Sequence, residues 1–478
     1  MAVGRAPAAA TLMSTVRSWA ITIEIAMNSE ISRIRRHYTL LLLFFVNAVS
    51  LIDRQIMGVL VEPIQREFGV SNTAMGLLTG VAFAFVYCIV ALPFGRYADR
   101  ANRRNFIGWS CGVWSLMTLL CGLATQYWHL AIARIGVAAG ESGSGASSIS
   151  IITDLYPPTA RARAMSLYML GAPIGAVIGL GVGARIAFEH GWRAAFIWMA
   201  IPGIMFALLI RLTGVEPRRG VQDPGAEPGA QTAAGARVKN ATQKTDEPLA
   251  VVLRDAFRSR PFMGIVLAGT LLSFSGYAYS IWGTAFLMRT HGVSLKDAGL
   301  LMGLVGGVGA IFGSLFSGWL CDRLAQRDSR WQLGVPIIGM LIALPMAIGY
   351  ALYPAGHPWL IGGVVVPRMI VFVLGLSVFS VWWLAPTYAA IAQIVPAHRR
   401  ATMVATYNFG ILAIGAGLGP LAVGVLSDVL TPVAGGHATG LALAASACGY
   451  LLGALVLISV VGGYARSINA TPAYVLSH

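Results

Sequence analysis

The sequence has little charge. Only 11% of its 478 residues are Asp, Glu, Lys or Arg, whereas a soluble protein has about 25%. Hydrophobic residues make up 56% of the chain and form long runs. So few charges cannot cover a water-soluble globule of this size. The composition therefore excludes a soluble protein and predicts an integral membrane protein.

Lysine and paired cysteine are scarce too. The only lysines are Lys239, Lys244 and Lys296, and none follows a glycine. This excludes the G-x-x-x-x-G-K-[ST] loop of an ATP-driven pump. The five cysteines form no C-x-x-C pair, so we interpret them as small apolar residues. With H-E-x-x-H also absent, we expect neither a metal nor a cofactor.

The basic residues outnumber the acidic ones, 34 to 19, and give a net charge of +15. They form short clusters between the apolar runs, so we expect no nucleic-acid partner. When the chain is divided into the membrane spans given below, 26 of the basic residues fall on the side that holds both termini. Five fall on the opposite side. Because Lys and Arg accumulate in cytoplasmic loops, this distribution predicts that both termini are cytoplasmic.

A bilayer core of about 30 Å requires about 20 apolar residues in a helix. Twelve stretches meet this requirement, in two groups of six. The predicted spans are Tyr38–Val61, Thr73–Phe94, Asn105–Thr125, Trp128–Thr153, Ala164–Phe188, Trp192–Leu212, Phe262–Met288, Leu295–Leu320, Leu333–Tyr353, Leu360–Val395, Ala401–Leu430 and Gly440–Tyr464. The predicted fold is an all-α membrane protein of two pseudo-symmetric six-helix bundles.

The spans divide the chain into five parts. The predicted domains are a cytoplasmic arm (1–37), a first bundle (38–212), a cytoplasmic linker (213–260), a second bundle (261–466) and a cytoplasmic tail (467–478). The arm is a poor signal peptide, because its apolar stretch Ala20–Met27 is short and contains Glu24. The linker is rich in Gly, Ala and Pro with mixed charge, so it cannot bury a core. Within it, Leu249–Phe257 is expected to form a short amphipathic helix.

The two halves of the sequence resemble each other at a constant offset of 223 residues. Gly69-Val70-Ser71 matches Gly292-Val293-Ser294, Gly76-Leu77-Leu78 matches Gly299-Leu300-Leu301, and Asp99-Arg100 matches Asp322-Arg323. The chain is therefore interpreted as a duplicated six-span unit. Parallel six-span repeats are the arrangement of major facilitator transporters, whose substrate site lies between the halves near the midplane.

The loop from Gly95 to Arg104 resembles the G-x-L-a-D-r-x-G-r-k/r signature of that superfamily, departing from it at Tyr97 and Asn102. A second copy begins at Gly318. The resemblance predicts that these loops gate the cytoplasmic side, since glycine permits close helix packing and the aspartate can accept hydrogen bonds. The alternative is that they are only turn and orientation residues. The predicted gating residues are Gly95, Asp99, Arg100, Gly318, Asp322 and Arg323.

A few charges fall inside the predicted spans, where each costs about 2.5–3.5 kcal/mol. They are Asp53, Arg54, Arg134 and Glu141, with Arg368 a further candidate. Neighbours on a helix point about 100° apart, so only one of Asp53 and Arg54 can face a central cavity. Glu141 lies seven residues from Arg134, so its partner is expected on span one. We hypothesise that Asp53 and Glu141 exchange protons under the control of Arg54; the alternative is a static ion cluster that fixes helix packing.

The segments around these charges resemble those of bacterial homologues of spinster. The resemblance rests on Leu51-Ile52-Asp53-Arg54-Gln55, on Arg134 to Ser142, and on Tyr156-Pro157-Pro158. In that family the span-one Asp-Arg pair and the span-four Glu are implicated in proton-linked gating, which the resemblance transfers to Asp53, Arg54 and Glu141. Eukaryotic members move lysophospholipids and sphingosine-1-phosphate. The resemblance also implies a location in the inner membrane of a bacterium.

The expected substrate is amphipathic with an anionic head, because aromatic residues accompany a basic one. The predicted substrate-binding residues are Arg134, Trp382, Trp383, Tyr388 and Asn408. The alternative is that these side chains face lipid or neighbouring helices.

We therefore predict a monomeric, proton-coupled secondary transporter of a lipid-like substrate, with protons and membrane lipids as its other partners, and not an enzyme. One alternative is a multidrug or small organic anion antiporter of the same superfamily. A remote alternative is an intramembrane serine protease using Gly140-Glu141-Ser142-Gly143, although no histidine falls in the membrane to activate the serine. A channel is disfavoured by the duplicated gating loops.

Overall fold

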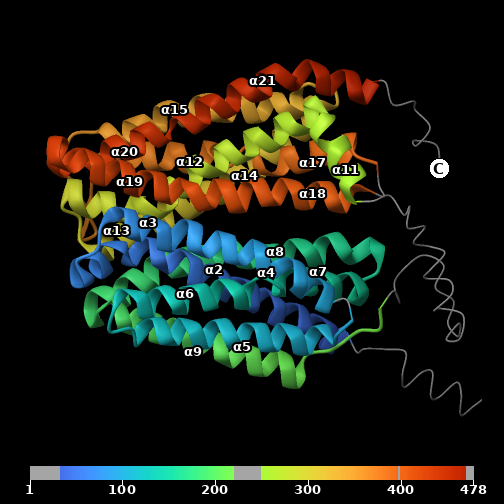
Figure 1. Cartoon of the computed structure of the whole chain (residues 1–478), viewed down its shortest axis with the longest axis horizontal. Helices are drawn as coiled ribbons and strands as arrows, with labels where there is room; N and C mark the ends of the chain where they lie inside the picture. The colour runs from blue at the N-terminus through green and yellow to red at the C-terminus, as the bar shows by residue number, and fades with distance from the viewer. Residues whose placement is uncertain (1–32, 99, 220–248, 397–398, 470–478) are drawn as a thin grey trace, which may run out of the picture.

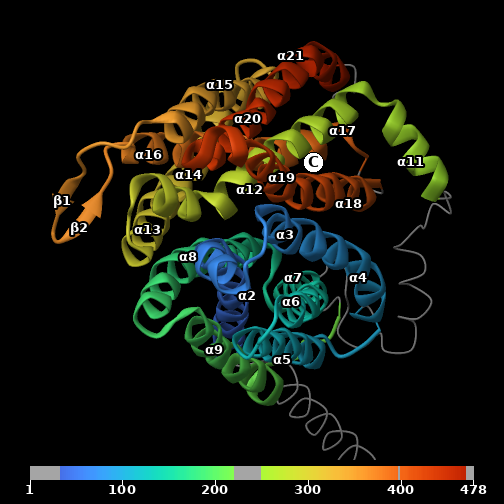
Figure 2. The ribbon, with the colours of Figure 1, turned by 60° about the vertical axis from the view of Figure 1, so that its left-hand side comes forward.

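The computed structural model describes residues 33–98, 100–219, 249–396 and 399–469. Its helices form two bundles that lie side by side with their long axes in the same direction (Figure 1). One end of the bundles, here the arginine-rich end, carries Arg103, Arg161, Arg330 and Arg399. The other, here the hairpin end, carries a short β-hairpin between two helices of the second bundle (Figure 2).

The first bundle is built from residues 33–213. Its elements are α2 (Arg33–Phe68), α3 (Asn72–Gly76), η1 (Leu77–Ala82), α4 (Phe83–Ala98), α5 (Arg103–Gly122), α6 (Tyr127–Glu141), α7 (Ser144–Leu155), α8 (Pro158–His190) and α9 (Trp192–Thr213). The elements α3, η1 and α4 follow one another as one crossing, and so do α6 and α7.

The second bundle follows a short amphipathic helix, α11 (Leu249–Arg258), which lies where the sequence predicts one. Its elements are α12 (Arg260–His291), α13 (Leu295–Leu301), η2 (Met302–Gly306), α14 (Gly307–Ala325), α15 (Trp331–Leu352), β1 (Trp359–Ile361), β2 (Val364–Val366), α16 (Ile370–Phe379), α17 (Leu384–Ile394), α18 (Arg400–Phe409), η4 (Gly410–Ala416), α19 (Gly417–Ala434), η5 (Gly435–His437), α20 (Ala438–Ser446) and α21 (Cys448–Asn469).

The predicted twelve crossings are present. Nine stretches of the described residues are long and apolar enough to cross a membrane, and one of them, Thr402–Ile468, holds two crossings separated by the turn at η5. Helix α5 and the α6–α7 pair supply the other two. The fold is therefore an all-α membrane protein of two six-helix bundles.

The prediction for span ten was wrong at its start. Residues 359–366 form the antiparallel hairpin β1–β2, with Trp359 opposite Val366, and the helix begins only at Ile370. Gly362 and Gly363 adopt positive φ angles of 58° and 80°, which suits a tight turn. Arg368 is exposed beside the hairpin and not in the membrane interior.

The sequence repeat has a direct structural counterpart. Gly69 and Gly292 each end a helix with φ of 62°. Two residues later, Ser71 and Ser294 each cap the next helix by accepting a hydrogen bond from a backbone N–H, at 3.1 and 3.2 Å. The same three residues therefore make the same turn in both halves.

Glycines on α8 allow it to lie directly against α2. Gly171, Gly175, Gly179 and Gly183 recur every four residues and share one face. A Cβ placed on Gly179 would lie 2.9 Å from the carbonyl oxygen of Ile52, whereas a Cβ on Gly181 would meet nothing within 4 Å.

We expect Gly179→Ala to destabilise the first bundle by about 1–3 kcal/mol, the usual cost of overpacking a tight contact. Thermal unfolding in detergent measures this as a lower melting temperature. Gly181→Ala on the same helix is the control, and it should be neutral or stabilising because alanine favours helix. Equal effects of the two substitutions would contradict the assigned contact.

Candidate transport site

A cavity of about 470 Å³ lies between the two bundles near the middle of α2 and α12. Most of its wall is apolar. Arg54 and Arg134 are the charged residues of the described lining, and Gln55, Tyr277 and Ser280 add polar groups. A mostly apolar cavity with guanidinium groups at one side suits an amphipathic anion.

Arg54 projects to this cavity from α2 and pairs with a carboxylate behind it. Its Nε donates to Oε2 of Glu141 on α6 at 2.7 Å, and the guanidinium lies 4.8 Å from the ring centre of Tyr87. The side chain of Glu141 is fully buried, whereas that of Arg54 is 23% exposed. Glu141 therefore has its partner on the first span, as its distance from Arg134 along α6 predicts.

Asp53 points away from the cavity into the first bundle. It is completely buried, and neither carboxylate oxygen makes a hydrogen bond to a described residue. Arg134 is close by, and its Nη1 donates to the backbone oxygen of Asp53 at 3.1 Å. Asp53 and Arg54 therefore face different ways, as two successive helical residues must.

Three of these charged groups have buried atoms that make no hydrogen bond in the described part of the chain. Oε1 of Glu141, both Asp53 oxygens and Nε of Arg134 are buried and make no hydrogen bond to a described residue. Unsatisfied charged atoms in a low-dielectric interior are costly. An arrangement that holds so many of them is suited to taking up a proton or a ligand.

The structure separates the predicted substrate-binding residues. Arg134 and Trp383 line the cavity. Trp382 does not: its ring lies 5.0 Å from that of Phe379 and 5.6 Å from that of Phe316, inside the second bundle. Tyr388 donates to Asn408, and this pair links α17 and α18 outside the cavity lining.

The predicted gating residues lie at the arginine-rich end. Arg100, Asp322 and Arg323 are exposed, and a Cβ on Gly95 or Gly318 would meet nothing within 4 Å. These glycines therefore make no close helix contact in this conformation, contrary to the expected reason for them. Asp99 lies outside the described residues.

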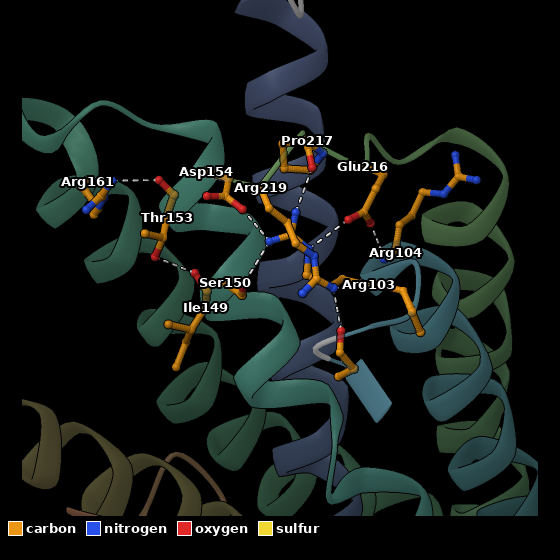
Figure 3. Close-up of polar contacts among 12 residues, drawn as sticks. Arg103, Arg104, Ile149, Ser150, Thr153, Asp154, Arg161, Glu216, Pro217 and Arg219 are labelled. Atoms are coloured by element: carbon orange, nitrogen blue, oxygen red, sulfur yellow. Dashed lines mark hydrogen bonds and ion pairs between the residues drawn. The ribbon is translucent and has the colours of Figure 1, made fainter. Parts of the chain in front are cut away.

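Arg103 makes several buried contacts that the sequence did not predict. In the sequence it is only one of the arginines in the loop from Gly95 to Arg104. It is 2% exposed; its Nη1 donates to Asp154 at 2.5 Å and to Ser150 at 2.8 Å, and its Nε donates to Glu216 at 2.8 Å (Figure 3). Its Nη2 donates to the carbonyl oxygen of Pro217. Arg103 thus fastens the chain after α9 to the end of the first bundle.

Arg103→Ala is expected to lower the stability of the protein by about 3–5 kcal/mol, because it leaves two carboxylates without their buried partner. The melting temperature in detergent measures the loss. Arg100→Ala, an exposed arginine in the same loop, should change it little. A small effect of Arg103→Ala would show that the ion pairs are not needed for folding.

The two halves are joined at the hairpin end by a polar cluster, here the hairpin latch. Asp428 of α19 accepts from the backbone N–H groups of Asn72 and Thr73 at 3.0 and 2.7 Å, and from both of their side chains at 2.7 Å. Arg289 of α12 pairs with Glu62 and donates to Gln65.

Ser142, the candidate nucleophile of the protease alternative, is hydrogen-bonded to the backbone of α6. Ser142 lies at the break between α6 and α7, and its hydroxyl donates to the carbonyl oxygen of Ala139 at 2.8 Å. Its proton is thus directed to a carbonyl group and not to a base, which removes the basis for the protease interpretation.

Two six-helix bundles around a central cavity define a multi-pass membrane transporter. The model of the Major Facilitator Superfamily matches residues 43–420, and the chain belongs to that family. A solved bacterial homologue of the human lysosomal transporter spinster, inward-facing and unoccupied, is similar with a TM-score of 0.73 and 27% identity, covering 92% of this chain and 98% of that one.

Relatives by sequence have several described functions. An MFS-type efflux pump of Mycolicibacterium smegmatis is 33% identical over 84% of this chain and 86% of its own. A sphingosine-1-phosphate transporter of Danio rerio is 28% identical over 88% of this chain and 81% of its own. A probable L-galactonate transporter of Escherichia coli is 25% identical over 90% of each chain. The family resemblance to spinster and to the major facilitators is thus confirmed, while the relatives differ in substrate.

Proposed function

We propose that the protein is a proton-coupled secondary transporter that moves an amphipathic, lipid-like anion by alternating access. The observation that carries this proposal is the Arg54–Glu141 ion pair at the cavity wall, with the completely buried Asp53 carboxyl on the preceding residue. Intramembrane charges of this kind are costly and are a mark of ion and substrate pathways.

The ion pair supplies a means of coupling. An anion in the cavity competes with Glu141 for Arg54, and a proton on Glu141 releases Arg54 for the anion. Anion binding and protonation of Glu141 therefore favour each other, and each ligand raises the affinity for the other. Asp53 is proposed as the second proton acceptor, because its carboxyl is completely buried beside the Arg54–Glu141 pair.

The arginine-rich end is proposed to face the cytoplasm of a bacterial cell, with the protein in the inner membrane and both termini inside. Residues 1–37, 213–260 and 467–478 are then the cytoplasmic arm, linker and tail. We propose that the hairpin latch closes the outer side of the cavity in this arrangement and that this conformation is the inward-facing one. The residues at Gly95 and Gly318 are proposed to engage when that state closes.

The substrate is proposed to be lysophospholipid-like or sphingoid-like. An apolar wall with the two guanidinium groups of Arg54 and Arg134 matches a molecule with one anionic head and an apolar body. The cavity lies within one chain, so a monomer is sufficient for transport. Protons and the surrounding lipids complete the proposed partners.

A small organic anion, such as a sugar acid, or a drug-like molecule is the second candidate substrate. The galactonate transporter and the efflux pump among the relatives favour it. Gln55, Ser273, Ser280 and Ser377 in the lining could serve a hydroxylated anion.

Uptake into proteoliposomes with and without an imposed pH gradient tests the proposal. Lysophospholipids and sphingoid phosphates are screened first, then galactonate and cationic dyes. Gradient-stimulated uptake of a lysolipid supports the full proposal. Stimulated uptake of galactonate or dye alone would replace the lipid-like substrate, and absence of stimulation by any of them would contradict proton coupling.

A further inference from the structure

The β1–β2 hairpin presents apolar side chains on both faces of its first strand. Trp359, Leu360 and Ile361 are 43%, 75% and 60% exposed. Successive residues of a strand point to opposite faces, so Leu360 lies on one face and the other two lie on the opposite one. An antiparallel sheet that borders water commonly has one polar face. This strand has none, so both of its faces are suited to an apolar surrounding.

The hairpin stands away from both bundles, beyond α13 and α16 (Figure 2). Its second strand is the anchored one, because β2 packs against α13 and Val366 is buried. All three residues of β1 are exposed. The apolar strand is therefore the outer one, directed away from the helices.

The helix that follows the hairpin places it close to the membrane surface. Helices α16 and α17 form one crossing of 25 residues, Ile370–Ile394. At about 1.5 Å per residue this crossing is about 38 Å long, slightly more than the hydrocarbon core of about 30 Å, so Ile370 lies in the headgroup region. Three residues separate Val366 from Ile370, and they can span at most about 14 Å. The base of the hairpin thus lies at or near that region.

The apolar surface of the hairpin continues the lipid-facing surface of the helices beside it. Leu352, the last residue of α15, is 50% exposed, and Val371 and Leu374 at the start of α16 are 58% and 48% exposed. All three lie outside the described lining of the central cavity. They belong to helices that cross the membrane, so they face the acyl chains of the bilayer.

The polar groups of the segment also match the surface of a membrane. Residues 353–369 contain no acidic side chain, and Arg368 is exposed. Tryptophan is enriched at the headgroup level of bilayers, and a guanidinium there can bond to phosphate oxygens. The backbone at the free edge of β1 excludes the centre of the bilayer, where an open strand edge cannot be satisfied. The segment is thus suited to the interface alone.

We propose that the β1–β2 hairpin binds the bilayer leaflet at the hairpin end, with the side chains of Trp359, Leu360 and Ile361 among the acyl chains and Arg368 bonded to a lipid phosphate. This interaction is independent of what the central cavity transports. Because β2 packs against α13, which contacts α8 of the other bundle, the lipid contact holds one side of the junction between the halves.

The experiment places a nitroxide label on the full chain in phosphatidylglycerol nanodiscs, after the five native cysteines are replaced. One protein has a single cysteine at position 360. The control has it at position 436, in the exposed turn between α19 and α20 at the same end. A Cβ on Gly436 would meet nothing within 4 Å, and Leu360 is exposed, so neither label should change the melting temperature.

Electron paramagnetic resonance measures the accessibility of each label to oxygen, which concentrates in the bilayer, and to a water-soluble nickel complex. The ratio of the two is expected to be several times higher at position 360 than at position 436. Equal ratios would overturn the proposal, because the hairpin would then lie in water. Protection of position 360 from both reagents would also overturn it, because protein and not lipid would then cover the strand.

Charge reversal tests the contact with phosphate. Arg368→Glu is expected to lower the ratio at position 360, since a carboxylate beside the hairpin is repelled by lipid phosphates. Arg327→Glu is the matched control, because Arg327 is equally exposed but lies at the arginine-rich end, and it should leave the ratio unchanged. An unchanged ratio in Arg368→Glu would overturn the assigned phosphate contact.

Discussion

A Glu141→Gln variant is expected to bind and exchange its substrate but to lose accumulation driven by a pH gradient. Glutamine has the same shape and still accepts the hydrogen bond that Arg54 donates to Glu141, but it cannot take up a proton. A difference of one pH unit drives about tenfold accumulation per coupled proton, and the variant should lose this factor. Uptake and counterflow in proteoliposomes measure the two properties separately.

Glu67→Gln is the matched control for this experiment. Glu67 lies near the end of α2, the helix that carries Arg54, pairs with Arg193 at 2.7 Å and is 43% exposed, away from the cavity. It should retain full coupling. Continued accumulation in Glu141→Gln would remove Glu141 from the mechanism, whereas loss of counterflow as well would indicate damage to the substrate site.

Asp428→Asn should open the hairpin end. The carboxylate of Asp428 accepts four hydrogen bonds from Asn72 and Thr73, and an amide can accept at one oxygen only. The loss of charge-assisted hydrogen bonds is expected to destabilise the state in which the hairpin end is closed by about 2 kcal/mol. This shifts the equilibrium about thirtyfold towards the state in which the hairpin end is open.

Alkylation of a single cysteine at position 280 measures this shift, after the five native cysteines are replaced. Ser280 lines the cavity and donates to Gln55 of the other half. An impermeant reagent added from the hairpin side should react faster in Asp428→Asn. Asp322→Asn, in the proposed gate at the opposite end, should slow it. Equal rates in all three proteins would show that the hairpin latch does not set the equilibrium.

Hydropathy and the repeat were sufficient to predict the fold. A run of about 20 apolar residues leaves a chain few alternatives in a bilayer, and the matched glycines Gly69 and Gly292 do make equivalent turns. The hairpin at 359–366 escaped prediction because its residues are as apolar as those of a span. The signal for it was the Gly362-Gly363 pair, which is typical of a turn.

In the candidate site, the sequence could predict only the directions in which side chains of one and the same helix point. Helical spacing separated Asp53 from Arg54 and directed Glu141 towards span one, which the ion pair confirms. It could not decide between Trp382 and Trp383, because both follow the end of α16, where the helical period stops. The partners of Arg103 and Asp428 depend on contacts between distant segments, which no local pattern encodes.

Three segments in the described part of the chain, η1, η2 and η4, are π-helical, with wider turns than the α-helices beside them. Thr79 of η1, Met302 of η2 and Ile411 of η4 all line the cavity, and each segment lies inside a crossing that also contacts the other half. Wider turns with weaker hydrogen bonding yield more easily than the α-helix on either side. Each of these crossings therefore bends most easily at its π-helical segment, which lies beside the cavity. The α-helical parts on either side of that segment can then move as rigid units. The helical parts near the hairpin end can stay in contact while the parts near the arginine-rich end change their direction. Closure around the substrate then requires no rotation of a whole bundle.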